Sequence, residues 1–379
     1  MAVDLFKRSV QIILKNQSPE GAYIASPNFP TYAYCWLRDG TYIASAMDRA
    51  GHPESAAAFF RWVDRTIRRY AGKVEKVVAY QEARQPLNTE EFLHTRYNLD
   101  GSEVTGVEWS NFQIDGYGTW LWGLAEHVTR TGERSLLPEL AESVRLTARY
   151  LDAVWCLPNS DCWEEHPEYQ HPYSLAAVHG GLQAALRLAE MGVEGLPLEE
   201  ITATAHAIFQ FVMQYGVKDG CLMKHIRPVE AGENDHDDHP EEEVDASLLG
   251  VCTPYRLLSS QDPIWQATLE KIEHDLHRRG GGVYRYLGDT YYGGGEWILL
   301  AGWLGWYYVE AGQPGKAQQL LEWIEAQGGD DGSLPEQVTL HTLSPGYLPE
   351  WEQRWGPVAN PLLWSHAMYL ILRDGLKNR

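Results

Sequence analysis

The segment from Cys162 to Tyr173, CWEEHPEYQHPY, contains two adjacent carboxylates directly after a tryptophan. An apolar ring beside a carboxylic acid removes water from it and raises its pKa, and a second carboxylate nearby acts in the same direction. An acid with a raised pKa stays protonated near neutral pH and can donate a proton to a leaving group. We therefore predict that Glu164, which follows Trp163 and precedes Glu165, is a general acid.

A third isolated carboxylate, Glu336, lies in the Gly-, Ser- and Pro-containing segment DGSLPEQ, residues 331–337. We interpret Glu164 and Glu336 as an acid and a base that face one sugar from two sides. Such a pair needs a separation of about 6.5–9.5 Å so that a water molecule fits beside the sugar. The alternative is that both are exposed loop carboxylates without a chemical role.

An Arg–Asp pair, Arg38 and Asp39, stands at a predicted helix start behind Tyr32, Tyr34 and Trp36. A guanidinium and a carboxylate beside aromatic rings can bind vicinal sugar hydroxyls through charge-assisted hydrogen bonds. In isolation the pair is equally consistent with an Asp that caps a helix and a surface Arg next to it.

Two further loops combine aromatic rings with polar groups. In EWSNFQIDG, Trp109 is expected either to cover a sugar face or to be part of the core. In GGVYRYLGDTYYGGGEW, Arg285 is expected either to hold hydroxyls at the scissile bond or to stack on surface tyrosines as a cation. Neither motif decides the function alone.

The composition excludes some classes of partner. The formal charge of −21 argues against nucleic acids and anionic membranes, both of which would repel the chain. The 15 Trp and 21 Tyr against 8 Phe suit stacking on sugar rings, because Trp and Tyr combine a flat apolar face with a polar group.

The N-terminal segment and the cysteines predict a cytoplasmic protein. MAVDLFKRSVQIILKNQ carries charges at helical spacing and lacks the uninterrupted apolar stretch of a signal peptide. The five cysteines are odd in number and lack metal-ligand spacing, so they indicate free thiols in a reducing compartment. The acidic run Gly232–Asp245 is expected to be a solvated loop, with a calcium site as the alternative.

Helical periodicity extends over nearly the whole chain. Pairs of helices separated by short Gly or Pro turns recur, and the first and last helices make one more pair. We predict an all-α, single-domain (α/α)6 toroid of about twelve helices over residues 1–379, with an open superhelix as the alternative. The first helix of each later pair has more small and apolar residues, so it is predicted to be the inner one. The expected helices span residues 3–14, 39–50, 54–70, 113–130, 135–151, 174–191, 198–215, 246–259, 264–277, 296–311, 315–327 and 361–376.

The motifs, taken in order, resemble those of the glucoamylase family of inverting glycoside hydrolases, family 15, which also contains glucodextranases, isomaltose glucohydrolases and some trehalases. The ordered set covers nearly the whole chain: YAYCWLRDG, WSNFQIDG, DCWEE, RYLGDTYYGGGEW, DGSLPEQ and LLWSHA. The resemblance implies an (α/α)6 barrel, in agreement with the count of helix pairs. It also implies an enzyme that needs no metal and no organic cofactor.

The resemblance assigns roles residue by residue. It implies that Glu164 is the general acid and Glu336 the general base, and that the product from an α-glucoside is β-glucose. Arg38 and Asp39 would bind the non-reducing-end glucose. The remaining positions would form walls, bind hydroxyls near the scissile bond or flank the reacting centre: Tyr32, Trp36, Trp109, Trp163, Glu165, Arg285, Tyr291 and Trp364.

The linkage that is cleaved stays open at this stage. The segment HTLSPGYLPEWEQRWGPVAN, between Glu336 and Trp364, is expanded and is expected to reshape the mouth of the site. Short α-1,4- or α-1,6-linked oligosaccharides, isomaltose among them, are the expected substrates. A trehalase, a non-catalytic sugar-binding regulator and a sugar epimerase are the alternatives; the last usually relies on a histidine base, which none of these motif loops offers with a partner.

Overall fold

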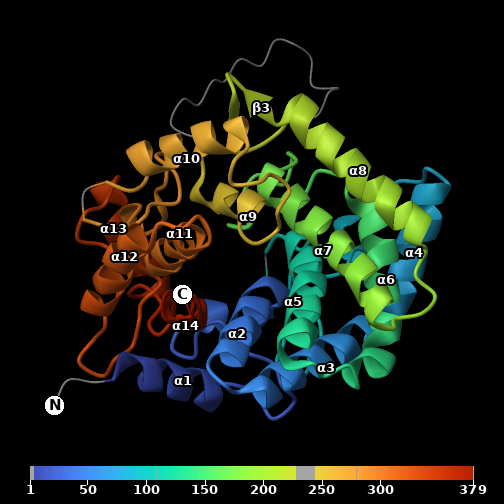
Figure 1. Cartoon of the computed structure of the whole chain (residues 1–379), viewed down its shortest axis with the longest axis horizontal. Helices are drawn as coiled ribbons and strands as arrows, with labels where there is room; N and C mark the ends of the chain where they lie inside the picture. The colour runs from blue at the N-terminus through green and yellow to red at the C-terminus, as the bar shows by residue number, and fades with distance from the viewer. Residues whose placement is uncertain (1–3, 108, 228–243, 279, 379) are drawn as a thin grey trace.

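The computed structural model describes residues 4–107, 109–227, 244–278 and 280–378. Six helices form an inner ring in which each packs on the next and the last packs on the first (Figure 1). The ring closes, so the predicted toroid is confirmed and the open superhelix is wrong. The inner helices are α2 (Leu37–Arg49), α5 (Asp115–Thr131), α7 (Pro172–Met191), α9 (Leu249–Cys252), α11 (Ile298–Glu310) and α14 (Leu363–Lys377).

A second layer of helices surrounds this ring. The first helix packs on the last, as the pairing of the two chain ends predicts, and α3, α6, α8 and α12 pack on the inner helices that precede them. Inner helices are buried on all sides: every residue of α11 from Ile298 to Val309 is buried, whereas α12 buries only one stripe. The outer helices are α1 (Leu5–Lys15), α3 (Pro53–Arg69), α6 (Leu136–Val154), α8 (Leu198–Tyr215), α10 (Pro263–Asp275) and α12 (Pro314–Ala326).

Small residues allow two inner helices to approach closely. A Cβ atom on Gly118 of α5 would lie 2.2 Å from the carbonyl oxygen of Ala177 on α7. A Cβ atom on Gly181 of α7 would lie 2.5 Å from the carbonyl oxygen of Gly118. Both glycines are therefore required by the distance between the helix backbones.

Short antiparallel ribbons join the loops at the ends of the inner helices. Strand β1 (Cys35–Trp36) pairs with β2 (Arg96–Tyr97), and β1 leads directly into α2. Strand β5 (Glu296–Trp297) leads into α11 and pairs with β6 (Gln337–Val338), which follows Glu336. A third ribbon joins β3 (Val217–Lys218) to β4 (Cys221–Leu222). The first and second ribbons hold the segments of Arg38 and Glu336 close to the ring.

One expected helix is wrong in part, and two helices were not expected. The helix expected over 246–259 is a 3-10 turn, η4 (Ala246–Leu248), followed by the four-residue α9, because Pro254 forces Thr253 out of the helical region. Helix α4 (Ala71–Glu82) lies in a stretch for which we expected no helix, and only two of its residues are buried. Helix α13 (Leu348–Trp355) lies in the expanded segment before α14. The other 3-10 turns are η1 (Pro30–Tyr32), η2 (Thr89–Glu91), η5 (Tyr291–Gly293) and η6 (Pro345–Tyr347).

The acidic run is not part of the described structure, apart from its last two residues, Val244 and Asp245, so the expectation of a solvated loop or a calcium site lies outside the described residues. None of the helices in the described ranges combines the length and the apolarity that crossing a bilayer requires.

Candidate active site

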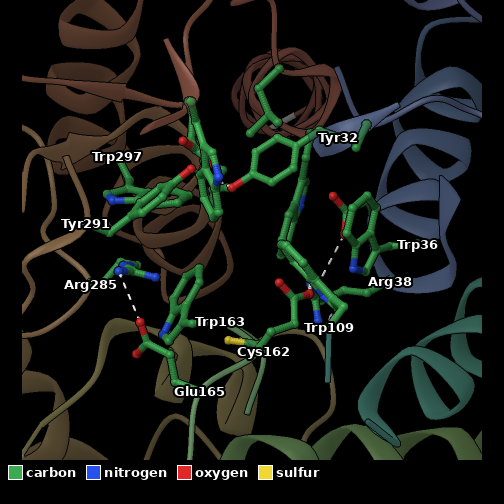
Figure 2. A pocket seen from close by; sticks show the side chains of 18 of the residues that line it. Tyr32, Trp36, Arg38, Trp109, Cys162, Trp163, Glu165, Arg285, Tyr291 and Trp297 are labelled. Carbon is green, nitrogen blue, oxygen red and sulfur yellow. Dashed lines mark hydrogen bonds and ion pairs between the residues drawn. The ribbon is translucent and has the colours of Figure 1, made fainter. Parts of the chain in front are cut away.

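The loops that enter the inner helices surround one cavity of about 330 Å³ (Figure 2). Every residue that we predicted for the site lines it, although these residues come from segments spread over most of the chain. They are Tyr32, Trp36, Arg38, Asp39, Trp109, Trp163, Glu164, Glu165, Arg285, Tyr291, Glu336 and Trp364.

The loop that carries Glu164 is tightly turned. The side chain of Asp161 accepts hydrogen bonds from the backbone N–H groups of Trp163 and Glu165, both at 2.9 Å. Glu164 has a φ of +63°, in the left-handed region that non-glycine residues rarely adopt. This turn lets two adjacent carboxylates serve different parts of the cavity: Glu164 contacts Arg38, and Glu165 contacts Arg285.

The environment of Glu164 suits a proton donor. Burial raises the pKa of its carboxyl group to about 7; the guanidinium of Arg38 opposes this shift and the carboxylate of Asp39 reinforces it. Arg38 donates from Nη2 to Oε1 of Glu164 at 3.2 Å. A substantial fraction of Glu164 is therefore protonated near neutral pH. The carboxylate whose charge raises the pKa of Glu164 is Asp39 and not the adjacent Glu165, which the sequence had suggested.

Arg38 is the centre of a buried ion cluster. Its guanidinium lies 3.0 Å from Oδ2 of Asp115 and 3.5 Å from Oδ2 of Asp39, and it faces the ring of Trp364 at 5.3 Å. Arg38 is only 4% exposed, so the alternative of a surface arginine beside a capping aspartate is wrong. Burial, opposed mainly by Arg38, raises the pKa of Asp39 to about 6. Asp115 is fully buried and was not among our predicted site residues, although it lies in the WSNFQIDG motif.

Arg285 is the centre of a second cluster. It is paired with Asp289 through Nε and Nη2, at 2.8 and 2.5 Å, and its Nη2 lies 3.5 Å from Oε1 of Glu165. The hydroxyl of Tyr286 donates to Oε2 of Glu165 at 2.6 Å. Burial acts to raise the pKa of Glu165, but the charges of Arg285 and Lys224 outweigh it and hold this pKa below its usual value. Glu165 is therefore an ionised acceptor. Arg285 is 3% exposed, so it is not a cation on surface tyrosines.

The loop of Glu336 is fixed by the two helices beside it. The hydroxyl of Ser365 donates to the carbonyl of Pro335 at 2.8 Å, and Nε2 of His366 accepts from the N–H of Leu334 at 3.0 Å, both at the start of α14. The carbonyl of Glu336 accepts from the N–H of Ile298, the first residue of α11, at 3.2 Å. The backbone around Glu336 is therefore held by α14 and α11.

The carboxyl group of Glu336 is buried against two hydroxyls. Burial raises its pKa to about 8, and hydrogen bonds from Tyr32 and Tyr291 and the charge of Arg285 oppose the shift. The hydroxyls of Tyr32 and Tyr291 lie 2.7 Å apart. The charges of both Glu336 and Glu164 raise the pKa of Tyr32, so this phenol lies within the field of both carboxyls. With this pKa the carboxyl is mostly protonated near neutral pH, and the three opposing groups favour the ionised form that a base requires without cancelling the effect of burial.

Helix α13, in the segment that we expected to reshape the mouth, adds an aromatic border whose residues were not among those predicted for the site. Trp351, Arg354 and Trp355 line the cavity. The ring of Trp355 stacks near Trp109, with centroids 6.4 Å apart at 27°, and Trp351 meets Tyr291 edge-on at 5.0 Å. The Trp–Glu–Gln–Arg–Trp run within the helix was the available signal, because two aromatics four residues apart share one helix face.

Trp109 is held from behind by a buried arginine. The guanidinium of Arg96 lies 3.8 Å from the centroid of the Trp109 ring and 4.5 Å from that of Tyr34. Strand pairing places Arg96 opposite Trp36. Trp109 thus joins Trp36 in a preformed wall and is not a core residue (Figure 2).

The described part of the chain contains no group of three or more His, Cys, Asp or Glu side chains arranged to hold a metal ion. The chemistry available in the cavity is that of two carboxyls with raised pKa values, two arginine–carboxylate clusters and aromatic walls. This combination fits proton transfer at a hydroxyl-rich, neutral substrate.

Comparisons with known proteins identify relatives of this chain. A family model described as "Glycosyl hydrolases family 15" matches residues 1–329. Isomaltose glucohydrolase of Kribbella flavida is 39% identical over 98% of this chain and 92% of its own length. Trehalase 2 of Sulfolobus acidocaldarius is 24% identical over 89% of this chain and 59% of its own length. The solved structure of a glycosidase variant in complex with glucose is 38% identical, with a TM-score of 0.89 over 99% of this chain and 96% of that one. The chain therefore belongs to glycosyl hydrolase family 15 and is a glycoside hydrolase.

Proposed function

We propose that this enzyme is an exo-acting hydrolase that releases β-glucose, with inversion, from the non-reducing end of short α-linked gluco-oligosaccharides, and that isomaltose is its preferred class of substrate. One observation carries the proposal: a small cavity holds Glu164 and Glu336 on separate loops, between two arginine–carboxylate clusters. Each cluster offers charged groups to the hydroxyls of one sugar on either side of the scissile bond.

The proposed reaction uses the two carboxyls in opposite protonation states. Arg38 and Asp39 bind the terminal glucose, and protonated Glu164 donates its proton to the glycosidic oxygen as the C–O bond breaks. Ionised Glu336 accepts a proton from a water molecule that attacks the anomeric carbon from the opposite face. The hydroxyls of Tyr32 and Tyr291 support the ionised form of Glu336, as their opposition to its pKa shift indicates.

The size of the cavity favours disaccharides. A volume of about 330 Å³ is at the lower end for ligand sites. Trp351 and Trp355 of α13 pack against the aromatic walls, and we infer that they limit the space for further sugars. The name of the Kribbella flavida relative, isomaltose glucohydrolase, supports the α-1,6 linkage.

A substrate panel with the product anomer followed by proton NMR tests the proposal. Isomaltose, maltose, trehalose and isomaltotriose are each incubated with the purified chain. We expect the highest kcat/KM for isomaltose, with β-glucose appearing before mutarotation. Preference for trehalose would assign the chain to the trehalases of this family instead. α-Glucose as the first product would refute inversion, and no turnover of any α-glucoside would favour a sugar-binding regulator.

A further inference from the structure

A buried lysine lies behind the cavity wall, outside the residues that touch the cavity. The side chain of Lys224 is 2% exposed, and its Nζ lies over the ring of Tyr286, 3.2 Å from the centroid. The same Nζ lies 3.9 Å from Oε2 of Glu165 and 3.9 Å from Oδ2 of Asp245. A buried ammonium group is costly unless other charges compensate it, so these two carboxylates and the ring face are the reason it is tolerated.

Asp245 connects this lysine to the wall of the cavity. Its carboxylate accepts the indole N–H of Trp163 on both oxygens, at 3.1 and 3.0 Å, and the backbone N–H of Ser247 at 2.7 Å. The Asp245 side chain is 2% exposed. Burial raises its pKa, and the charge of Lys224 opposes this shift. The orientation of the Trp163 ring is therefore set by Asp245, whose charge is balanced by Lys224.

The backbone on both sides of the pair is built into the loops of the site. Ile226 and Gln170 exchange two backbone hydrogen bonds, at 2.6 and 3.1 Å, which joins the segment of Lys224 to the loop of the candidate acid. The N–H of Ala246 donates to the carbonyl of Arg285 at 2.8 Å, which joins the segment of Asp245 to the second arginine cluster. Lys224 and Asp245 are thus fixed relative to both walls.

The two arginine clusters contact different carboxylates of the loop that carries the candidate acid. Arg38 contacts Glu164 itself, whereas Arg285 contacts the next residue, Glu165. If the Arg38 side binds the terminal glucose, as the proposed function states, then Glu165 and Trp163 face the leaving sugar. Lys224 reaches both: Glu165 directly and Trp163 through Asp245.

We propose that Lys224 and Asp245 are positioning residues for the leaving sugar: they hold Glu165 and Trp163 in place and thereby set the preference for a sugar leaving group over other leaving groups. This inference rests on the proposed function and deepens it. The pair does not act on the terminal glucose, and the proton transfers do not pass through it.

Two substrates separate this role from a general effect on the fold. Isomaltose needs the leaving-sugar side, whereas α-glucosyl fluoride has the same glucose and a leaving group that reaches none of these residues. For Lys224→Met we expect kcat/KM on isomaltose to fall by about tenfold or more, chiefly through KM, which corresponds to ~1.4 kcal/mol of transition-state binding. On α-glucosyl fluoride we expect a change of less than about threefold, since nothing that touches the terminal glucose is altered.

The matched control is Lys316→Met, which removes the same charge from a half-exposed pair with Glu273 on the outer layer. We expect this control to leave kcat/KM unchanged on both isomaltose and α-glucosyl fluoride. Lys224→Arg keeps the charge and should recover part of the isomaltose activity, and Asp245→Asn should show the same selectivity with a smaller loss. These two variants keep the test open if Lys224→Met does not fold.

Equal losses on both substrates in soluble, folded variants would show that the pair has only a structural role. Unchanged isomaltose kinetics in Lys224→Met would likewise overturn the inference while leaving the proposed function intact. A wild-type enzyme inactive on both compounds would overturn the proposed function, and the inference with it.

Discussion

Replacing Arg38 with Met tests the reasoning about the buried ion cluster directly. Arg38 is the cation shared by Asp39, Asp115 and Glu164, at 3.5, 3.0 and 3.2 Å. All of these groups are buried or nearly so. Removing the guanidinium leaves several carboxyls in one small volume with no equivalent counter-charge, while Met preserves much of the apolar stem.

The size of the effect follows from burial. Removing one partner of a buried ion pair destabilises a protein by about 3–5 kcal/mol, because the remaining charge is uncompensated. Unfolding entropy of roughly 2.1 cal/mol/K per residue gives about 0.8 kcal/mol/K for a chain of 379 residues. We therefore expect the melting temperature of Arg38→Met to fall by about 4–6 °C at pH 8.

The loss should depend on pH with a definite sign. Burial already raises the pKa values of Glu164, to about 7, and Asp39, to about 6, and Arg38 opposes both shifts. Without Arg38 the folded-state values rise further above those of the unfolded chain, so the folded variant binds more protons. The destabilisation is then greatest above these values and shrinks as the pH falls from 8 to 5.

Differential scanning calorimetry of wild type and variant at pH 5, 6.5 and 8 measures both quantities. Arg61→Met is the control, since it breaks a pair with Glu139 that is 3.0 Å long but exposed on both sides. We expect that control to change the free energy of unfolding by less than about 1 kcal/mol. An Arg38→Met variant that melts within a degree of wild type, or that loses the same stability at every pH, would refute the account of the cluster.

Three other predictions concern catalysis, the mouth and the fold. The pH profile of kcat/KM should fall on the acid side as Glu336 gains a proton and on the alkaline side as Glu164 loses one, with both flanks at higher pH than for ordinary carboxyls. The profile of Glu164→Gln on α-glucosyl fluoride should lack the alkaline flank. An alkaline flank that persists in this variant would exclude Glu164 as the acid. Trp355→Ala should raise kcat/KM for isomaltotriose relative to isomaltose, measured by chromatography of the released glucose, and an unchanged ratio would mean that α13 does not limit substrate length. Gly118→Ala should lower the free energy of unfolding, measured by urea titration, by about 1–3 kcal/mol, because its Cβ would meet the α7 backbone. The control Gly315→Ala, where a Cβ has open space, should leave the free energy of unfolding unchanged or raise it slightly. Equal effects of the two substitutions would contradict the close packing of α5 and α7.

Most of the ring was predictable from local signals. Pro stands at the start of α3, α7, α10 and α12, and Gly132 ends α5 in the left-handed conformation, so helix boundaries could be placed within about two residues at most ends. The exceptions were elements with weak patterns. Helix α4 buries only Val74 and Val77, and none of the α13 side chains is fully buried, so neither gives a sustained apolar period.

The sequence predicted the site residues that lie in motif loops, but it did not predict the ion-pair and hydrogen-bond partners of those residues. Arg38 and Asp115 are 77 residues apart, and Trp163 and Asp245 are 82 apart. No local sequence pattern relates positions so far apart; the packing of the ring helices and their loops brings them together. Asp289 was easier to predict as a partner of Arg285, because it lies only four residues after it in the sequence. The roles of Glu164, Glu336 and the binding residues stay predictions until variants are assayed.

The contact between α14 and α2 has a consequence for biosynthesis. Trp364 and the backbone that supports Glu336 depend on α14, which leaves the ribosome long after its neighbour α2. Until residues 363–377 emerge, the nascent ring lacks one inner helix, and the apolar surfaces of α2 and α11 that contact it are exposed to water or to chaperones. We therefore expect folding to be governed by this long-range docking step, and catalytic competence to arise only once α14 has docked.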